Sequence, residues 1–254
     1  MLTFGLIGFP LTHSFSEKYF LEKFQRERIS DVQYKLFPLA NLSEFREFIL
    51  DNPGIRGLNV TIPYKQKIIS FLDELDVTAK AIGAVNTIKF VRTADRRRIL
   101  IGHNTDAYGF EISIRSFLGK EKPQALILGS GGGSKAVQYV LNKLRIPFTL
   151  VSRKKKTASS DKNQISYEDL NEKIILENKL IINTSPLGMF PDTESFPPIP
   201  YVFLDNSHFI YDLVYNPEET TFLKKGKEQG ANIMNGMEML QLQAERSWQI
   251  WNQF

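Results

Sequence analysis

The stretch LILGSGGGSKA, residues 126–136, places four glycines in five positions, between a short apolar run and a segment with helical character. A strand ending before Gly129 would let this residue make the tight turn, and Gly131 would let the backbone approach a pyrophosphate at the free N–H groups of the next helix. Ser134 takes the third glycine position of the pattern G-x-G-x-x-G, and the small Ala136 can serve the close helix packing instead. The loop predicts a phosphate cradle, although a turn that needs only a positive φ would use the same glycines.

The next strand-like run, FTLVSRKKK at residues 148–156, bears on the choice of cofactor. An NAD site usually places Asp or Glu about 20 residues after the glycine loop to bind the ribose 2′-hydroxyl, whereas this chain has Ser152, Arg153 and three lysines there. Cations attract the additional phosphate of NADP, and the Arg153 guanidinium can form paired hydrogen bonds with it. NADP is therefore the expected cofactor; for a basic run taken alone, a solvated surface turn is the alternative.

Strand-like runs occur in two sets along the chain. The second set starts with the glycine loop and continues at residues 148–153, 179–185, 209–214 and 231–236, mostly separated by helix-length segments, as a doubly wound parallel sheet requires. The first set lies at residues 3–8, 34–39, 55–62, 84–91 and 98–104, with helical stretches such as 16–28 and 42–50 between them. The sequence thus predicts an α/β fold with two domains and a boundary near residues 103–122.

Composition excludes several classes of function. The chain has 254 residues, 42% of them apolar, which suffices for one large or two ordinary domains. It has no cysteine, which rules out disulfides and thiolate chemistry, and its three histidines are scattered, so no metal site is expected. The net charge is +4, and charges of both signs are distributed along the chain, so no continuous basic segment of the kind that binds nucleic acid is expected. No apolar run approaches the roughly 20 residues that span a bilayer, and the N-terminus lacks signal-peptide features; we expect a cytoplasmic protein without a membrane partner.

Three polar stretches of the first domain also stand out. LTHSFSEK places Ser14 and Ser16 at a helix start, where two hydroxyls can hold a carboxylate or one of them can simply cap the helix. NVTIPYK, residues 59–65, ends in a lysine that in isolation would be read as a solvated residue. In GHNTD, residues 102–106, Asn104 or Asp106 can be only the N-cap of the following helix.

Together these pieces resemble one known family. SFS, NVTIPYK, GAVNTI, GHNTDAYGF, GSGGGSKA, NTSPLGM, DLVYNP and GMEMLQLQA occur in the order and at about the spacing of the shikimate dehydrogenases, over essentially the whole chain. The resemblance implies NADPH-dependent reduction of 3-dehydroshikimate to shikimate, a step of aromatic amino-acid biosynthesis. It also implies a substrate-binding catalytic domain formed by residues 1–103 and 237–254, a Rossmann-type NADP-binding domain formed by residues 104–236, and substrate held between them.

The resemblance also assigns residues. Lys65 and Asp106 match the family's catalytic pair. Positions that match substrate contacts are Ser14 and Ser16, which would bind the carboxylate, and Thr61, Asn86, Asp106, Tyr215 and Gln243. Positions that match the cofactor site are Gly129, Gly131, Gly132, Ala136, Arg153, Thr184, Gly236 and Met237. Met189 belongs to the turn PLGM, which is also similar to a turn of the family.

The residue types of the pair suit the reaction. Hydride from the nicotinamide reaches a ketone carbon, negative charge grows on the oxygen, and a positioned ammonium can stabilise that charge and supply a proton. Lys65 is therefore the expected acid/base, and Asp106 would orient it. Whether Lys65 rests as an ammonium or an amine stays open, because a nearby carboxylate favours the first and burial the second.

The sequence departs from the family pattern at three places. Ser152 stands where Asn usually precedes the arginine, Ser130 replaces an Ala of the loop, and Asn235 replaces an Asp before Gly236. Loss of the Asn would weaken a ribose or phosphate contact that Lys154–Lys156 could replace. The margin of NADP over NAD therefore stays open.

Other functions remain as alternatives. A nucleotide-binding regulatory protein could keep the loop and the basic turn but would not need Lys65, Asp106 and a carboxylate pocket together. A methyltransferase would normally want an acid where Arg153 stands, and a glutamyl-tRNA reductase needs a cysteine. The nearest alternative is a quinate/shikimate dehydrogenase with broader substrate or NAD use. A monomer and a homodimer are both open.

Overall fold

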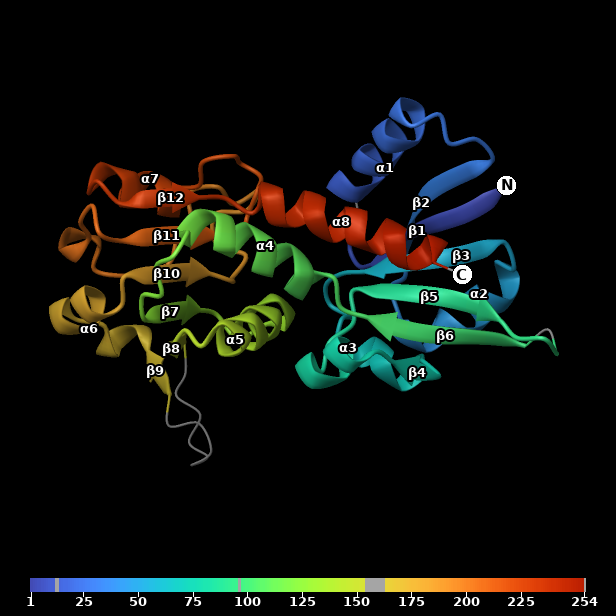
Figure 1. Ribbon diagram of the computed structural model, residues 1–254, viewed down its shortest axis with the longest axis horizontal. Helices are drawn as coiled ribbons and strands as arrows, with labels where there is room; N and C mark the ends of the chain where they lie inside the picture. Colours follow the sequence, from blue (N-terminus) through green and yellow to red (C-terminus); the bar gives the residue numbers. More distant parts are fainter. Residues whose placement is uncertain (12–13, 96, 154–162, 254) are drawn as a thin grey trace. The chain divides into compact units, whose positions relative to one another are not determined.

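The computed structural model describes residues 1–11, 14–95, 97–153 and 163–253 (Figure 1). By its internal contacts the chain divides into unit 1, Met1–Tyr108 with Gln241–Phe254, and unit 2, Gly109–Leu240. Each unit has its own six-stranded sheet. The expected α/β fold class is confirmed.

The sheet of unit 1 is mixed. Its strands are β1 (Leu2–Gly8), β2 (Val32–Pro38), β3 (Ile55–Val60), β4 (Glu74–Leu75), β5 (Thr87–Arg92) and β6 (Arg98–His103), in the order β2-β1-β3-β5-β6-β4. β1 is parallel to β2 and β3, whereas β5 is antiparallel to both β3 and β6. Consequently the carboxyl ends of β1, β3 and β6 and the start of β5 lie at the same edge of the sheet.

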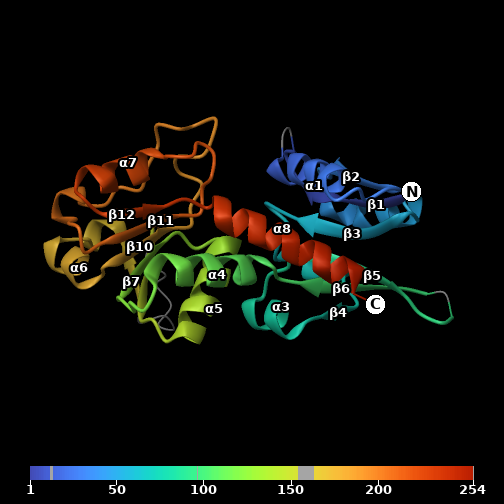
Figure 2. The ribbon, with the colours of Figure 1, turned by 45° about the horizontal axis from the view of Figure 1, so that its top comes forward.

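Apolar side chains cover both faces of this sheet. On one face, Phe4 and Phe20 pack with Trp251 of the C-terminal helix; a Cβ at Gly57 would lie 2.3 Å from the Trp251 ring, so only glycine allows this approach. Figure 2 shows the C-terminal half of this helix beside β3 and β5. Phe45 and Ile68 belong to the core on the other face. The helical elements of unit 1 are α1 (Phe15–Arg26), η1 (Leu42–Glu44), α2 (Phe45–Asp51), η2 (Lys67–Phe71), α3 (Val77–Ile82) and the part of α8 (Met237–Asn252) from Gln241.

The sheet of unit 2 is parallel throughout. Its strands are β7 (Ala125–Leu128), β8 (Phe148–Ser152), β9 (Gln164–Ser166), β10 (Leu180–Asn183), β11 (Phe209–Asp212) and β12 (Asn232–Met234), in the order β12-β11-β10-β7-β8-β9. The chain order reverses between β7 and β10, which is the topology of a Rossmann-type sheet, and ligands of such sheets bind at the carboxyl ends of the strands beside this reversal. Two strands, β4 and β9, were not expected from the sequence because each has only two or three residues.

Helices cover both faces of the second sheet as well. The core of one face includes Ile175, Phe222 and Leu223, and on the other face Phe110 packs edge-on against Tyr211 with ring centroids 5.4 Å apart. β7 is buried along its whole length, which explains its uninterrupted apolar sequence. The helical elements are α4 (Asp106–Leu118), which starts in unit 1, α5 (Gly132–Leu144), η3 (Tyr167–Asp169), α6 (Glu172–Glu177), η4 (Tyr201–Phe203), α7 (Thr221–Glu228) and the start of α8.

Candidate active site

An ion pair lies at the polar edge of the first sheet. Lys65 follows β3, Asp106 follows β6, and Nζ of the lysine donates to Oδ2 of the carboxylate at 2.7 Å. The side chain of Asp106 is only 3% exposed, whereas that of Lys65 is 21% exposed. The carboxylate is thus fixed inside the unit, and the ammonium keeps access to a bound molecule.

Asn86, at the start of β5, is the second partner of Asp106. Its Oδ1 accepts from the backbone N–H of Thr105 at 2.7 Å and its Nδ2 donates to Oδ1 of Asp106 at 2.9 Å. Because a backbone N–H can only donate and a carboxylate can only accept, the orientation of this carboxamide is unambiguous. Nδ2 also lies 3.0 Å from Oε1 of Gln243 on α8, so the carbonyl end of Gln243 faces Asn86 and its NH₂ end is left to donate elsewhere.

Asn104 caps helix α4. Its Oδ1 accepts from the backbone N–H of Ala107 at 3.1 Å, and its Nδ2 donates to the carbonyl of Ala84 at 2.9 Å. Asp106 is therefore not needed as the N-cap, and the carboxylate is engaged by Lys65 and Asn86 instead.

The loop after β3 holds Thr61 and Lys65 in place through its backbone. The N–H of Thr61 donates to the Ile7 carbonyl at 2.9 Å, and the carbonyl of Lys65 accepts from the N–H of Val85 at 2.7 Å. A Cβ at Gly8 would lie 2.5 Å from a methyl group of Thr61, so glycine at the end of β1 allows this loop to close over the strand. Thr61 and Lys65 thus lie at the same edge as Asp106.

Ser14 and Ser16 follow β1 at that edge. Ser14 is the N-cap of α1, and its Oγ accepts from the N–H of Ser16 at 3.1 Å. Ser16 lies near the phenol of Tyr34, whose pKa is raised by burial. Capping by Ser14 is therefore present, and it leaves the hydroxyl proton of Ser14 available to a ligand.

Several polar residues to which the sequence alone gave no role extend the site inward. Oδ1 of Asn59 accepts from the phenol of Tyr34 at 2.8 Å, and its Nδ2 lies 3.0 Å from Oγ of Ser247. Ser247 is fully buried and also lies 2.8 Å from Oγ1 of Thr87. Its spacing of four residues from Gln243 on α8 was the one available signal, because residues four apart share a helix face.

In unit 2, the glycine loop lies beside the reversal point. Gly129 has φ = +108°, and a Cβ there would lie 2.9 Å from Oγ1 of Thr184, the first residue after β10. Thr184 donates from Oγ1 to the Leu128 carbonyl at 2.8 Å. Gly131 is the N-cap of α5 without any side-chain cap, Gly132 is the first helical residue, and Ala136 is fully buried.

The other predicted cofactor residues belong to the same edge of this sheet. Arg153 directly follows β8, whose Val151 pairs with Leu128 of β7; Lys154–Lys156 lie outside the described residues. Gly236 packs on the loop after β11, where a Cβ would lie 2.2 Å from the Leu213 carbonyl oxygen. Met237 starts α8, and Asn235 caps this helix through Oδ1, 3.1 Å from the Met237 N–H. Tyr215 follows β11 and belongs to unit 2, and Met189 lies in the loop after β10.

The residues present fit a dinucleotide. A Cβ at Gly131 would meet no atom of the described chain within 4 Å, so the backbone faces open space there. The uncapped start of α5 provides N–H donors for phosphate oxygens.

No comparable arrangement supports a metal site: across the described ranges, no three His, Asp or Glu side chains gather as ligands. Of the helices that the structure describes, none is long and apolar enough to cross a membrane.

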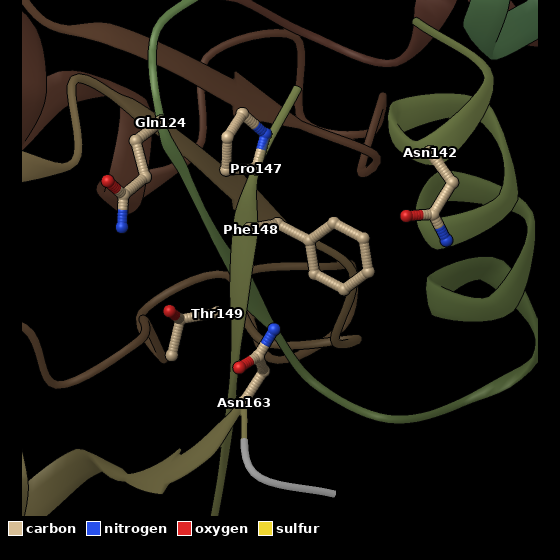
Figure 3. Close-up of a pocket in the computed structure, with 6 residues that line it drawn as sticks. All are labelled: Gln124, Asn142, Pro147, Phe148, Thr149 and Asn163. Carbon is tan, nitrogen blue, oxygen red and sulfur yellow. The ribbon is translucent and has the colours of Figure 1, made fainter. Parts of the chain in front are cut away.

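A shallow pocket of about 240 Å³ lies elsewhere in unit 2. It is lined by Gln124, Asn142, Pro147, Phe148, Thr149 and Asn163, at the amino ends of β7 and β8. Figure 3 shows Gln124 and Thr149 on one side of β8 and the Phe148 ring on the other, so the polar groups do not converge. This pocket is at the opposite end of the strands from Gly129 and Arg153.

Comparison with known proteins gives a consistent result. Residues 6–88 match the family model described as the shikimate dehydrogenase substrate binding domain. The chain is 39% identical over 264 residues to the shikimate dehydrogenase (NADP(+)) of Clostridium beijerinckii, with 98% of this chain and 92% of the relative covered. It is 35% identical over 262 residues to the enzyme of the same name from Methanosphaera stadtmanae, with 97% and 90% covered.

A solved structure extends the likeness to the fold. Shikimate 5-dehydrogenase from Thermus thermophilus, crystallised in complex with NADP(H) and shikimate, superposes with a TM-score of 0.83 at 26% identity, covering 99% of this chain and 93% of the other. The similarity thus spans both units of the chain.

Proposed function

The chain belongs to the shikimate dehydrogenase family, and on this premise we propose that it catalyses the NADPH-dependent, reversible reduction of 3-dehydroshikimate to shikimate in the biosynthesis of aromatic amino acids. The observation that carries the proposal is the 2.7 Å ion pair between Lys65 and Asp106, with Asn86 on the second carboxylate oxygen. A protein that only bound a nucleotide would not need this pair.

The chemistry divides between the two units. When bound, NADPH supplies a hydride to the ketone carbon. Lys65 stabilises the negative charge that grows on the ketone oxygen and gives that oxygen a proton; in the reverse direction its amine takes the proton back. Asp106 holds the Nζ of Lys65 through Oδ2. Because Asn86 binds the other oxygen, the carboxylate has a fixed orientation, and it restricts the position of the lysine.

The remaining assignments follow the same proposal. Unit 1 corresponds to the substrate-binding catalytic domain, proposed as residues 1–103 with 237–254, and unit 2 to the NADP-binding domain, proposed as residues 104–236. Ser14 and Ser16 bind the substrate carboxylate, while Thr61, Asn86, Tyr215 and Gln243 contact the ring and its hydroxyls. The proposed cofactor contacts are Gly129, Gly131, Gly132, Ala136, Arg153, Thr184, Gly236 and Met237.

The proposal extends to cellular setting and assembly. Shikimate, 3-dehydroshikimate and NADP(H) are its partners, with neither nucleic acid nor membrane involved, and it works in the cytoplasm as a monomer or a homodimer. Light scattering on the purified chain distinguishes the two assemblies.

A single assay tests the activity. The purified chain is given shikimate or quinate, each with NADP or NAD, and the absorbance of reduced nicotinamide is followed. We expect turnover with shikimate and NADP; turnover of quinate, or equal use of NAD, would favour the broader quinate/shikimate dehydrogenase, and no turnover of either acid would refute the dehydrogenase.

A further inference from the structure

A buried acidic residue of unit 2 has no role in the function proposed so far. Asp212 is the last residue of β11 and Asn183 is the last residue of β10; both are fully buried, and they are paired in register on neighbouring parallel strands (Figure 1). The same edge carries Gly129 and Thr184 at the reversal point. Asp212 therefore lies directly under the loops where a Rossmann-type sheet binds its ligand.

Three donors from three segments meet on this carboxyl group. Its Oδ1 accepts from Nδ2 of Asn183 at 2.9 Å and from the backbone N–H of Val214 at 3.0 Å. Its Oδ2 accepts from Oγ1 of Thr220 at 2.6 Å. Thr220 in turn caps α7, since its Oγ1 accepts from the N–H of Leu223. One carboxyl group thus connects the end of β10, the loop after β11 and the start of α7.

Two of these three donors have a fixed direction. The amide of Asn183 must present its NH₂ end to Asp212, because its Oδ1 accepts from the backbone N–H of Ser185 at 3.0 Å. The N–H of Val214 can only donate, whereas the hydroxyl of Thr220, which accepts from Leu223, keeps both its proton and a second lone pair. An ionised Asp accepts from all three donors, whereas an Asn that keeps the bonds to Asn183 and Val214 must turn its NH₂ group toward Thr220 and reverse the hydrogen bond there.

The contacts continue from Asp212 to the predicted nicotinamide side of the cofactor site. Asn183 fixes the turn that follows Thr184 through Ser185. Val214, held by Asp212, accepts at its carbonyl from the N–H of Gly236 at 3.1 Å. Thr184 directly follows Asn183, and Gly236 is hydrogen-bonded to Val214, so each is in direct contact with a residue that Asp212 binds.

We propose that Asp212 is a positioning residue of the dehydrogenase, whose carboxylate fixes the loops after β10 and β11 so that Thr184 and Gly236 hold the nicotinamide ring in the orientation needed for hydride transfer. This role rests on the function proposed above. It is distinct from adenosine binding, because the glycine loop and Arg153 belong to β7 and β8, and no hydrogen bond described in the structure joins them to Asp212.

The variant Asp212→Asn tests this role. Hydride transfer should slow by about 10-fold or more, which a rise of the primary isotope effect with deuterated NADPH would report, while the dissociation constant of NADPH changes less than about 3-fold. The matched control is Asp205→Asn, near the other end of β11: Asp205 binds Ser207, His208 and Lys179, so its loss should lower the melting temperature of unit 2 without changing kcat or the isotope effect. Assays are run at least one pH unit above the pKa of Asp212, which burial raises to about 7, so that the carboxyl group is mostly ionised.

The outcomes separate the two proposals. A folded Asp212→Asn enzyme with the kcat and isotope effect of the wild type would overturn the positioning role alone, and no turnover by the wild-type chain would overturn the proposed function and this role with it. If Asp212→Asn does not fold, Thr220→Val decides: it removes the donor to Oδ2 and also the side-chain cap of α7. Asn171→Ala, which removes the cap of α6 in the same unit, controls for the lost cap. A raised isotope effect in Thr220→Val alone supports the role, and an unchanged one refutes it.

Discussion

The Nζ of Lys65 and the Oδ2 of Asp106 are 2.7 Å apart although β3 and β6, the strands that precede them, are separated by β5 in the sheet. The pair is unequal: the carboxylate is buried and held by Asn86 from its other side, while the lysine side chain remains partly exposed. Replacement of each residue should therefore change the kinetics of the enzyme in a different way.

Replacement of Lys65 by Ala should lower kcat by about 10²-fold or more, because positioned acid–base groups commonly contribute 10²- to 10⁴-fold. The dissociation constant of NADP, measured by titration, should stay nearly unchanged because the proposed cofactor residues belong to unit 2. Lys67→Ala, an exposed lysine two residues further on, is the matched control and should keep wild-type kcat. A Lys65→Ala enzyme with near-normal kcat would remove this lysine from the mechanism.

Asp106→Ala should also lower kcat and raise KM for shikimate, because the carboxylate both orients Lys65 and is proposed to contact a substrate hydroxyl. The two residues act as a unit, so the double variant should be little slower than the worse single variant. Steady-state kinetics of the wild type, the two single variants and the double variant complete this double-mutant cycle. Fully multiplicative losses would show that the residues work independently.

Much of the architecture could be predicted from local patterns. The glycine loop, the apolar run of β7 and the helical period of α5 all depend on neighbouring residues, and the structure has Gly129 at a positive φ as that pattern requires. β4 and β9 could not be predicted, since two or three residues carry too little periodicity and their pairing depends on distant strands.

The site shows the same limit. Ser14, Lys65 and Asp106 were visible as motifs, but the contacts of Asn59 with Tyr34 and Ser247 join residues 25 and 188 positions apart, which no spacing rule reports. Asp212 stands within the motif DLVYNP, yet the motif alone gives it no role, because its importance comes from the donors that three separate segments bring to it.

The double variant Ser14→Ala/Ser16→Ala should raise KM for shikimate while NADP affinity stays nearly unchanged, because the two hydroxyls are proposed to bind only the substrate carboxylate. Loss of the Ser14 cap should also cost about 1 kcal/mol of stability. Asn41→Ala removes the side-chain cap of η1 in the same unit and controls for that cost. A folded double variant with normal KM would mean that the serines serve the helix alone.

The stability of the chain should carry a pH signature from Asp212. Burial raises the pKa of this carboxyl group from 3.8 to about 7, so between these values the folded chain holds a proton that the unfolded chain has released. The contribution of Asp212 to the free energy of unfolding therefore falls as pH rises through this window, by at most about 1.4 kcal/mol per pH unit for one proton. Asp212→Asn should remove this slope in urea titrations at several pH values.

Asp205→Asn is again the control. Hydrogen bonds from Ser207 hold the pKa of Asp205 below its usual value, so in the part of that window above about pH 5 both the folded and the unfolded chain have it ionised. Its replacement should shift stability by an amount that does not vary with pH there. A slope that is identical in the wild type and in Asp212→Asn would contradict the raised pKa.

The choice of cofactor is tested at Arg153, which directly follows β8 beside the glycine loop of β7. Arg153→Ala should weaken NADP by about 1.5 to 3 kcal/mol through the loss of charge-assisted hydrogen bonds to the 2′-phosphate, which corresponds to roughly 10- to 150-fold in dissociation constant. NAD lacks that phosphate, so its affinity should change little. Lys143→Ala, near the far end of α5 and paired with Glu111, removes a positive charge of unit 2 at another place and should leave both affinities unchanged. Equal losses for NADP and NAD in Arg153→Ala would mean that the arginine binds a group common to both nucleotides, and preference for NADP would then have to come from another cation.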